Sequence, residues 1–274
     1  MFKIITDSTA YFTRSEARNL GITIVPMTFT IKDKRFIEGY SGEQKEHFID
    51  IEKNLSYCKT SQPNLKIFFD AFSHVIKDNT HSALCITMSS RLSGAFNSAT
   101  VAAAEVAQGQ ICVFDSLSIA GGEKILVEKA VELSNQGKTI EEAVYILTEL
   151  RNQLKVLFSV SDMEALRRSG RIGFVKQSIS NILNIVPLLR LKSGAIESIT
   201  NARGIYNFLK RAKTFIPKDI NAVTVMSFEK DKAKLIGEYL THNYPTLKKV
   251  DILQPGAILA IHLGNKSFGI AWQE

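Results

Sequence analysis

The segment Ala83-Leu84-Cys85-Ile86-Thr87-Met88, followed directly by Ser89-Ser90-Arg91-Leu92-Ser93-Gly94, decides the fold. Its first half is an apolar run of strand length, which is typical of a strand buried on both faces of a parallel sheet. A helical pattern over residues 95–106 and a strand pattern over 111–114 come next. Strands that alternate with helices predict a parallel sheet that helices cover on both faces.

The alternation continues on both sides of this segment. We predict strands at 2–6, 22–25 and 27–31, and helices at 13–20, 43–53, 65–77, 120–136 and 140–153. Thr13 and Thr139 are expected to cap two of the helices, because glutamates follow each of them in the first turn. The three- and four-residue spacing within helix 65–77 places four apolar residues on one face: Leu65, Phe68, Phe69 and Phe72.

The pattern changes after about residue 153. A strand at 155–160, a helix from Asp162 and an apolar stretch at 179–191 precede short strand-like segments at 195–199, 222–228, 250–253, 258–262 and 268–272. Residues 264–267 form a hairpin-type turn between the last two. We interpret the chain as two α/β domains, residues 1–153 with a mainly parallel sheet covered by helices and residues 154–274 with a mixed sheet.

Composition limits the class of protein. The 274 residues are 45% apolar and 22% charged, and no run approaches the length of about 18 apolar residues that a membrane span needs. The start of the chain turns polar at Thr6, too early for a signal-peptide core. Cys58, Cys85 and Cys112 are widely spaced and odd in number, which suggests neither disulfides nor a metal site. We therefore expect a soluble, cytoplasmic protein without stable membrane insertion.

The net charge of +7 is unevenly distributed. Residues 151–215 carry 12 Lys and Arg against 3 Asp and Glu, whereas residues 1–150 carry 15 against 18. A basic segment suits an anionic partner such as a phosphorylated ligand, a nucleic acid or an acidic protein face. The alternative is an ordinary basic surface in contact with water.

Two segments rich in hydroxyl groups are candidate ligand-binding loops: Thr60-Ser61-Gln62-Pro63-Asn64 and Ser89 to Gly94. Each is expected where a strand of the parallel sheet leads into a helix, which is the edge at which such sheets usually bind ligands. Neutral donors beside unpaired helix amides provide a small anion site. The alternative is that these side chains only cap the helices.

Several enzyme signatures are missing from the sequence. It has no Gly-x-x-x-x-Gly-Lys-Ser/Thr loop for nucleotide phosphates, no Gly-x-Ser-x-Gly nucleophile elbow and no His-Glu-x-x-His metal motif. We therefore expect no catalytic residues, no metal and no cofactor.

Three other residues could bear on function. His262 ends an apolar segment beside a glycine, so it is a candidate ligand contact, and a hydrogen-bonded core histidine is the equal alternative. Asp7 and Asp115 each follow a predicted strand. We interpret both as turn formers rather than catalytic carboxylates.

Taken together, these motifs resemble the DegV family of bacterial fatty-acid-binding proteins over essentially the whole chain. The motifs that carry the resemblance are, in order, Ile5-Thr6-Asp7-Ser8-Thr9, Thr60-Ser61-Gln62-Pro63, Ser89-Ser90-Arg91-Leu92-Ser93-Gly94, Phe114-Asp115-Ser116, Ser169-Gly170-Arg171-Ile172, Leu183-Asn184-Ile185, Asn201-Ala202-Arg203 and His262-Leu263-Gly264. Each motif alone is weak, and their shared order and spacing make the resemblance specific.

The resemblance implies that a long-chain fatty acid lies between the two domains, its tail in an apolar tunnel shaped by residues such as Ile179, Ile182, Leu183 and Leu188. It implies a head-group site of Thr60, Ser61, Ser93, Gly94 and His262. Members of this kind also serve as the carrier subunit of bacterial fatty acid kinase. They present the carboxylate to a separate ATP-dependent kinase protein and leave with the acyl phosphate. Arg171 and Arg203 would then face the kinase or the phosphate.

Three positions depart from the usual pattern of the family. Ser169 replaces a common glycine, Val186 a common lysine and Leu263 a common small hydroxyl residue, so one head-group hydrogen bond is in question. The alternative function is a small-molecule acyl hydrolase that uses Ser93 or Ser61 with His262. Nucleic-acid binding through residues 151–215 is disfavoured, because that segment lacks the interleaved aromatic residues of a stacking surface.

Overall fold

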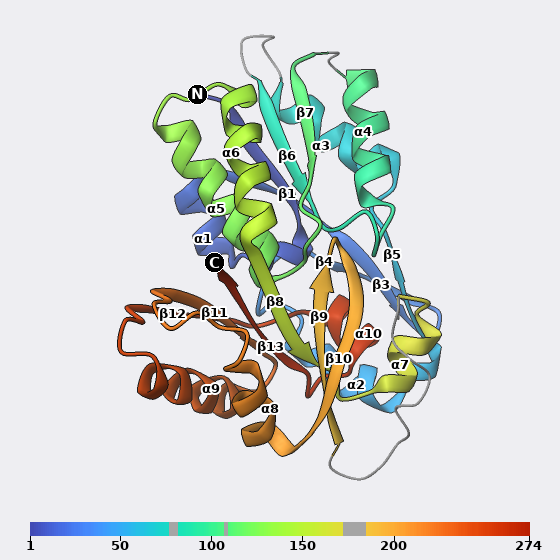
Figure 1. Cartoon of the computed structure of the whole chain (residues 1–274). Helices are drawn as coiled ribbons and strands as arrows, with labels where there is room; N and C mark the ends of the chain where they lie inside the picture. The colour runs from blue at the N-terminus through green and yellow to red at the C-terminus, as the bar shows by residue number, and fades with distance from the viewer. Residues whose placement is uncertain (77–81, 107–108, 172–184) are drawn as a thin grey trace.

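The computed structural model describes residues 1–76, 82–106, 109–171 and 185–274. Its strands form a parallel sheet of four strands, an antiparallel sheet of three and a mixed sheet of six, which we call sheets A, B and C. In Figure 1 sheet A and its helices fill the upper half of the view, and sheet C fills the lower half. The predicted α/β class, with a parallel sheet and a mixed sheet, is confirmed.

Sheet A is the parallel sheet predicted from residues 83–94. Its strands, in spatial order, are β2 (Ile22–Val25), β1 (Lys3–Asp7), β6 (Ala83–Thr87) and β7 (Ile111–Asp115). Every residue of β6 is buried, as expected for a central strand between two layers of helices. The connection from β1 to β2 contains a short 3-10 turn, η1 (Ser8–Ala10), and helix α1 (Arg14–Leu20).

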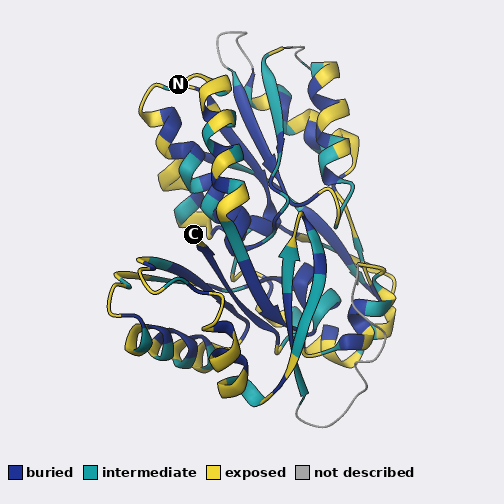
Figure 2. Ribbon diagram, viewed as in Figure 1, coloured by how far each residue is buried: buried dark blue, intermediate teal, exposed yellow. Residues whose placement is uncertain are grey.

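Helices cover both faces of sheet A. One face packs on α5 (Gly121–Asn135) and α6 (Ile140–Gln153), and the other packs on α3 (Leu65–Val75) and α4 (Ala95–Val106). Figure 2 shows buried strands between helices whose outer sides are exposed. Thr13 and Thr139 cap α1 and α6 as predicted, since each side chain accepts a hydrogen bond from the amide of the glutamate three residues on.

Sheet B consists of β4 (Lys34–Glu38), β3 (Met27–Ile31) and β5 (Cys58–Ser61), with β3 in the centre. Between β4 and β5 the chain forms η2 (Lys45–His47), α2 (Phe48–Lys53) and η3 (Leu55–Tyr57). Helix α10 (Ala257–Leu263), from the far end of the chain, packs against β3, β5 and α2. Sheet B therefore connects the two halves of the molecule.

Sheet C contains the described strands of the second half, in spatial order β10 (Ala195–Arg203), β9 (Ile185–Lys192), β8 (Leu154–Ser159), β13 (Phe268–Gln273), β11 (Ala222–Ser227) and β12 (Lys249–Leu253). Among these described strands, β11 and β12 pair in parallel and the other neighbours are antiparallel. Helices α8 (Gly204–Ala212) and α9 (Lys230–Asn243) cover one face around the buried Trp272. Helix α7 (Met163–Arg168) follows β8.

The strand predicted at 258–262 is wrong, because these residues belong to α10. The turn at 264–267 consequently joins a helix to β13 instead of joining two strands. A short apolar run does not distinguish a buried strand from a buried helix. Here a distant side chain favours the helix, since the Glu38 carboxyl accepts a hydrogen bond from the Ile258 amide in its first turn.

Other local predictions also need correction. Thr60 and Ser61 lie in β5 of the antiparallel sheet, so only the segment from Ser89 to Gly94 follows a parallel strand. The helix predicted at 43–53 begins at Phe48. Elements β4, α8 and α9 were not predicted. On α3, Phe68 and Phe72 are buried as expected, but Leu65 and Phe69 are exposed.

Some predictions lie outside the described residues, namely those for Ile172, for the apolar residues Ile179, Ile182 and Leu183, and for Asn184. The division into domains at residues 153 and 154 stays a prediction. The strand before this point, β7, belongs to sheet A, and the strand after it, β8, belongs to sheet C. Within the described ranges, no helix is long and apolar enough to cross a membrane.

Candidate ligand-binding site

A cavity lies where the three sheets and α10 meet. Met88 and Leu92 line it from the end of β6, Phe158 from β8, Leu191 from β9 and Leu259 from α10. Most of the residues that line it are apolar, as is usual for small-molecule sites. The cavity can therefore hold a ligand that is mainly hydrocarbon.

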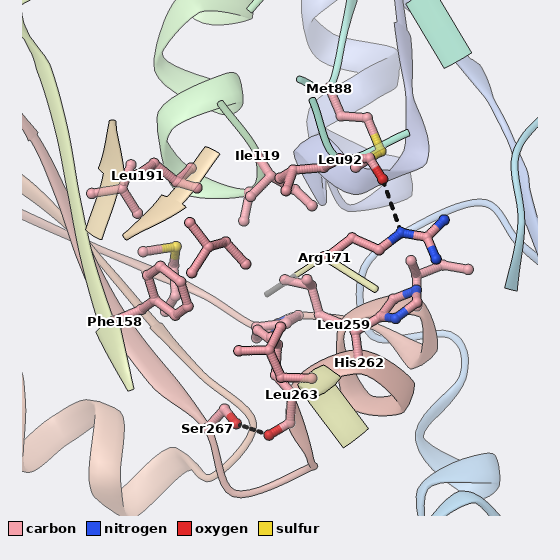
Figure 3. Close-up of a pocket in the computed structure, with 18 of the residues that line it drawn as sticks. Met88, Leu92, Ile119, Phe158, Arg171, Leu191, Leu259, His262, Leu263 and Ser267 are labelled. Carbon is pink, nitrogen blue, oxygen red and sulfur yellow. Dashed lines mark hydrogen bonds between the residues drawn. The ribbon is translucent and has the colours of Figure 1, made fainter. Parts of the chain in front are cut away.

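A group of polar residues lies at one end of the cavity, although Ser159 and Ser267 also line it. Thr60, Ser93 and His262 all line it, and Oγ1 of Thr60 lies 2.7 Å from Nε2 of His262. Figure 3 shows His262 and Arg171 close together on one side and Phe158 and Leu191 on the opposite side. The cavity thus has a polar end and an apolar end.

His262 is neutral at pH 7. Burial, and then the positive charge of Arg171, lower the pKa of the imidazole from 6.5 to about 4. A neutral imidazole carries one N–H, so Nε2 either donates to the Thr60 hydroxyl or accepts from it, depending on the tautomer. Arg171 is a cationic group at this end, and its Nε donates to the Leu92 carbonyl at 3.2 Å.

The loop after β6 brings Ser93 to the cavity. The Ser93 Oγ accepts a hydrogen bond from the Ala95 amide at 3.2 Å, so it helps to cap α4 while it lines the cavity. Gly94 lies just behind it, against the side-chain amide of Gln62, which would have to move if residue 94 carried a Cβ atom. Gln62, which belongs to the predicted hydroxyl-rich loop but was not named as a site residue, also lines the cavity.

Two predicted site residues lie elsewhere. Ser61 follows Thr60 in β5, so its side chain points to the other face of the strand, where it is exposed. Arg203 is exposed at the end of β10, in a separate surface pocket with Asn201 and Arg211. The structure thus brings together Thr60, Ser93, His262 and Arg171, with Gly94 beside them, but not Ser61 or Arg203.

Asp7 and Asp115 hold the loops at the edge of sheet A. The buried Asp7 carboxyl accepts hydrogen bonds from the amides of Thr9 at 3.0 Å and Met88 at 2.8 Å. Oδ1 of Asp115 accepts from the amides of Ser90 at 3.1 Å and Leu117 at 2.9 Å. These bonds agree with the interpretation of both residues as turn formers.

In the described part of the chain, no group of three or more His, Cys, Asp and Glu residues is arranged to hold a metal ion. Leu263, which stands where a hydroxyl residue is common in the family that the sequence resembles, lines the cavity with an apolar side chain.

These features define a class: an α/β protein whose parallel and mixed sheets enclose a largely apolar cavity with polar groups at one end. The chain belongs to the DegV family, because the sequence profile of that family matches residues 1–274. The family is described as uncharacterised protein, DegV family.

Relatives support this assignment over the full length. A DegV domain-containing protein of Staphylococcus aureus is 29% identical over 277 residues, 97% of this chain and 96% of the relative. A solved structure of a DegV family protein from Thermus thermophilus, which describes its fatty acid binding, is 26% identical in sequence to this chain. The match has a TM-score of 0.88 and covers 100% of this chain and 99% of the other. The Streptococcus pneumoniae Fatty Acid Kinase (Fak) B3 protein loaded with linoleic acid shares the fold at 21% identity, with a TM-score of 0.84 and coverage of 100% and 99%.

Proposed function

We propose that the cavity binds one long-chain fatty acid, with the carboxylate at Thr60, Ser93 and His262 and the tail directed toward Phe158 and Leu191. The observation that carries this proposal is the contact between the Thr60 hydroxyl and the His262 imidazole at one end of a mostly apolar cavity. The fatty acid binding of the related Thermus thermophilus protein supports the ligand class.

The energetics favour a ligand of this kind. Burial of a sixteen-carbon tail contributes on the order of 12 kcal/mol at about 0.8 kcal/mol per methylene, before the losses of association. Each hydrogen bond to the charged head group adds about 1.5–3 kcal/mol. The tail thus supplies most of the affinity, and the hydroxyl groups set the orientation.

The charges of the polar end suit a ligand that must also leave. The imidazole is neutral, and Arg171, the cation beside it, is exposed to solvent. A carboxylate there is attracted by a positive potential without being locked into a buried ion pair. An acyl phosphate, which carries more negative charge, can therefore exchange with the fatty acid at the same end.

We further propose that the protein is a cytoplasmic carrier without catalysis of its own, which presents the carboxylate to a separate ATP-dependent kinase. In that reaction a carboxylate oxygen bonds to the γ-phosphorus of ATP as the bond to ADP breaks, so the carrier supplies the nucleophile. Gln62 and Arg171 line the cavity and are exposed, so a partner protein can reach the polar end. Arg203 and Arg211 offer a second basic contact on sheet C and α8.

The hydrolase alternative is less well supported. It requires the imidazole to accept a proton from a serine, whereas the hydrogen-bond partner of His262 among the described residues is Thr60. A histidine whose pKa is about 4 is also a weak general base at neutral pH.

Native mass spectrometry of the protein purified from a bacterial host tests the proposal. We expect a bound mass of fatty-acid size in the wild-type protein and in Thr100→Val, a control on the exposed side of α4. The double variant Thr60→Val/Ser93→Ala should retain its fold and lose most of the bound ligand. A wild-type protein that stays empty and takes up neither palmitate nor oleate would refute the proposal.

A further inference from the structure

Helix α10 forms one wall of the cavity. Ile258, Leu259, His262 and Leu263 all line it, and Ile258 and His262 lie one helical turn apart on the same face. The placement of this short helix therefore decides where the imidazole lies relative to Thr60.

The start of α10 is held by a residue from another part of the chain. Its N-cap position is Gly256, which has no side chain to accept a hydrogen bond from the helix amides. Glu38, at the end of β4, fills this role, since its Oε2 accepts a hydrogen bond from the Ile258 amide at 3.0 Å and the Ala257 amide also faces the carboxyl. Only 1% of Glu38 is exposed, so the carboxyl is shielded from bulk water.

Gly256 is needed for this contact. A Cβ atom at that position would collide with Oε2 of Glu38 and would lie 3.0 Å from the ring of Tyr11. The carboxyl is therefore packed directly on the backbone at the helix start, and the tyrosine ring also lies close to that backbone. Its role depends on close approach, which a larger residue at 256 would prevent.

The same sheet carries both attachments of α10. Glu38 pairs with Met27 on one side of β3, and Thr60 pairs with Phe29 on the other side. Glu38 binds the first turn of α10, and Thr60 binds His262 in its last turn. Sheet B thus fixes the helix at both ends and sets the distance between the hydroxyl and the imidazole.

We propose that Glu38 is a positioning residue of the head-group site, which holds α10 so that His262 stays within hydrogen-bond distance of Thr60. The effect of Glu38 on ligand binding rests on the proposed function, whereas its effect on the contact between Thr60 and His262 does not. Glu38 itself lies outside the set of residues that line the cavity.

The first test needs no ligand. Nuclear magnetic resonance of the imidazole nitrogens follows the titration of His262 in the wild-type protein and in Glu38→Met, which keeps the volume but removes the acceptor. We expect the pKa of His262 to rise from about 4 toward 6.5 in Glu38→Met, because a loosened helix exposes the ring to water. Glu38→Gln retains an acceptor and should behave as the wild type.

Two further variants keep the test decisive. Glu52→Ala removes an exposed carboxylate that bonds to Asn265 and Lys266, just beyond the other end of α10, and should leave the titration unchanged. Gly256→Ala pushes the Glu38 carboxyl away without altering it, and should shift the titration in the same direction as Glu38→Met. A folded Glu38→Met or Gly256→Ala protein with an unchanged His262 titration would overturn the proposal.

The second test uses ligands. The affinities for palmitate and for methyl palmitate, which has the same tail without the charge, are compared in each variant. Glu38→Met should reduce the preference for palmitate over methyl palmitate about tenfold. Adding His262→Ala to Glu38→Met should reduce this preference little further, because both changes remove the contact between His262 and Thr60. Equal losses for both ligands would mean a general defect of the cavity and would contradict a positioning role. A wild-type protein that binds neither ligand refutes the proposed function, and the titration still decides the role of Glu38.

Discussion

The hydroxyl oxygen of Thr60 and Nε2 of His262 lie 2.7 Å apart, although 202 positions separate the two residues in the chain. The imidazole is neutral, so its single proton is on either Nε2 or Nδ1, and the two tautomers give the Thr60 hydroxyl different hydrogen-bonding roles. When Nε2 carries the proton, it donates to Thr60, and the threonine hydroxyl is free to donate to a carboxylate. In the other tautomer the hydroxyl proton points at the imidazole. Fatty acid binding should therefore select the tautomer with the proton on Nε2.

Removal of the nearby cation should raise the pKa of His262. Arg171 lowers it by charge repulsion, but burial is the larger cause, so in Arg171→Ala the pKa should rise from about 4 and stay below 6.5. The shift is measured from the imidazole resonances between pH 3 and 8. Arg168→Ala, an exposed charge on α7, is the control and should give the wild-type curve. An unchanged curve in Arg171→Ala would contradict the arrangement of the polar end.

The buried carboxyl of Glu38 should make stability depend on pH. Burial raises its pKa from 4.5 to about 8 in the folded protein, so its contribution to stability is complete below pH 4.5 and is lost as the pH rises through 8. Glu38→Gln does not titrate. Relative to this variant, the wild type should lose on the order of a few kcal/mol in its free energy of unfolding between pH 5 and 9. Urea unfolding of both proteins at a series of pH values measures this free energy. If the wild type and Glu38→Gln lose stability in parallel as the pH rises, the Glu38 carboxyl makes no such contribution.

The apolar end of the cavity should set the chain length. Leu191→Trp fills space opposite the polar end, so the preferred fatty acid should become shorter, at about fourfold in affinity for each methylene that no longer fits. Leu191→Ala should favour longer chains. Displacement of a fluorescent fatty acid by a series of chain lengths gives the preference. Lys192→Ala, the exposed neighbour on β9, should keep the wild-type order. A preference that does not move in either Leu191 variant would place the tail elsewhere.

The basic pocket on sheet C should matter to the partner and not to the ligand. Arg203 lies apart from the cavity, so Arg203→Ala should leave fatty acid affinity unchanged. In acyl phosphate formation with a fatty acid kinase, it should raise the KM for the carrier about three- to tenfold and weaken the dependence on salt, with kcat nearly unchanged. Lys218→Ala removes an exposed charge outside the basic segment as a control. Identical kinetics for Arg203→Ala and the wild type would exclude this contact.

The parallel half of the fold could be predicted because its signals are local. The apolar run of β6 and the capping threonines before α1 and α6 each report on their own neighbourhood. Helix α10 could not be predicted, because its first turn is stabilised by Glu38, which lies 220 positions earlier in the chain. Strand β5 was missed for a similar reason: Thr60 and Ser61 form a strand because β3 offers them an edge.

The candidate site followed from the sequence only in part. Hydroxyl groups near helix starts and a histidine beside a glycine pointed to Thr60, Ser93 and His262, and the structure places all three on one cavity. The sequence did not separate Ser61 from Thr60, because the alternation of side chains along a strand matters only once the strand is known. The family resemblance implied that Arg171 faces the kinase or the phosphate; Arg171 lines the cavity beside His262, and its role stays a prediction.

A crystal structure of the protein saturated with palmitate tests the central claim most directly. We predict continuous density through the cavity, with carboxylate oxygens about 2.5–3.2 Å from Oγ1 of Thr60 and Oγ of Ser93 and with the tail ending near Phe158 and Leu191. Density that runs in the opposite direction, or a cavity that stays empty at saturating palmitate, would contradict the account.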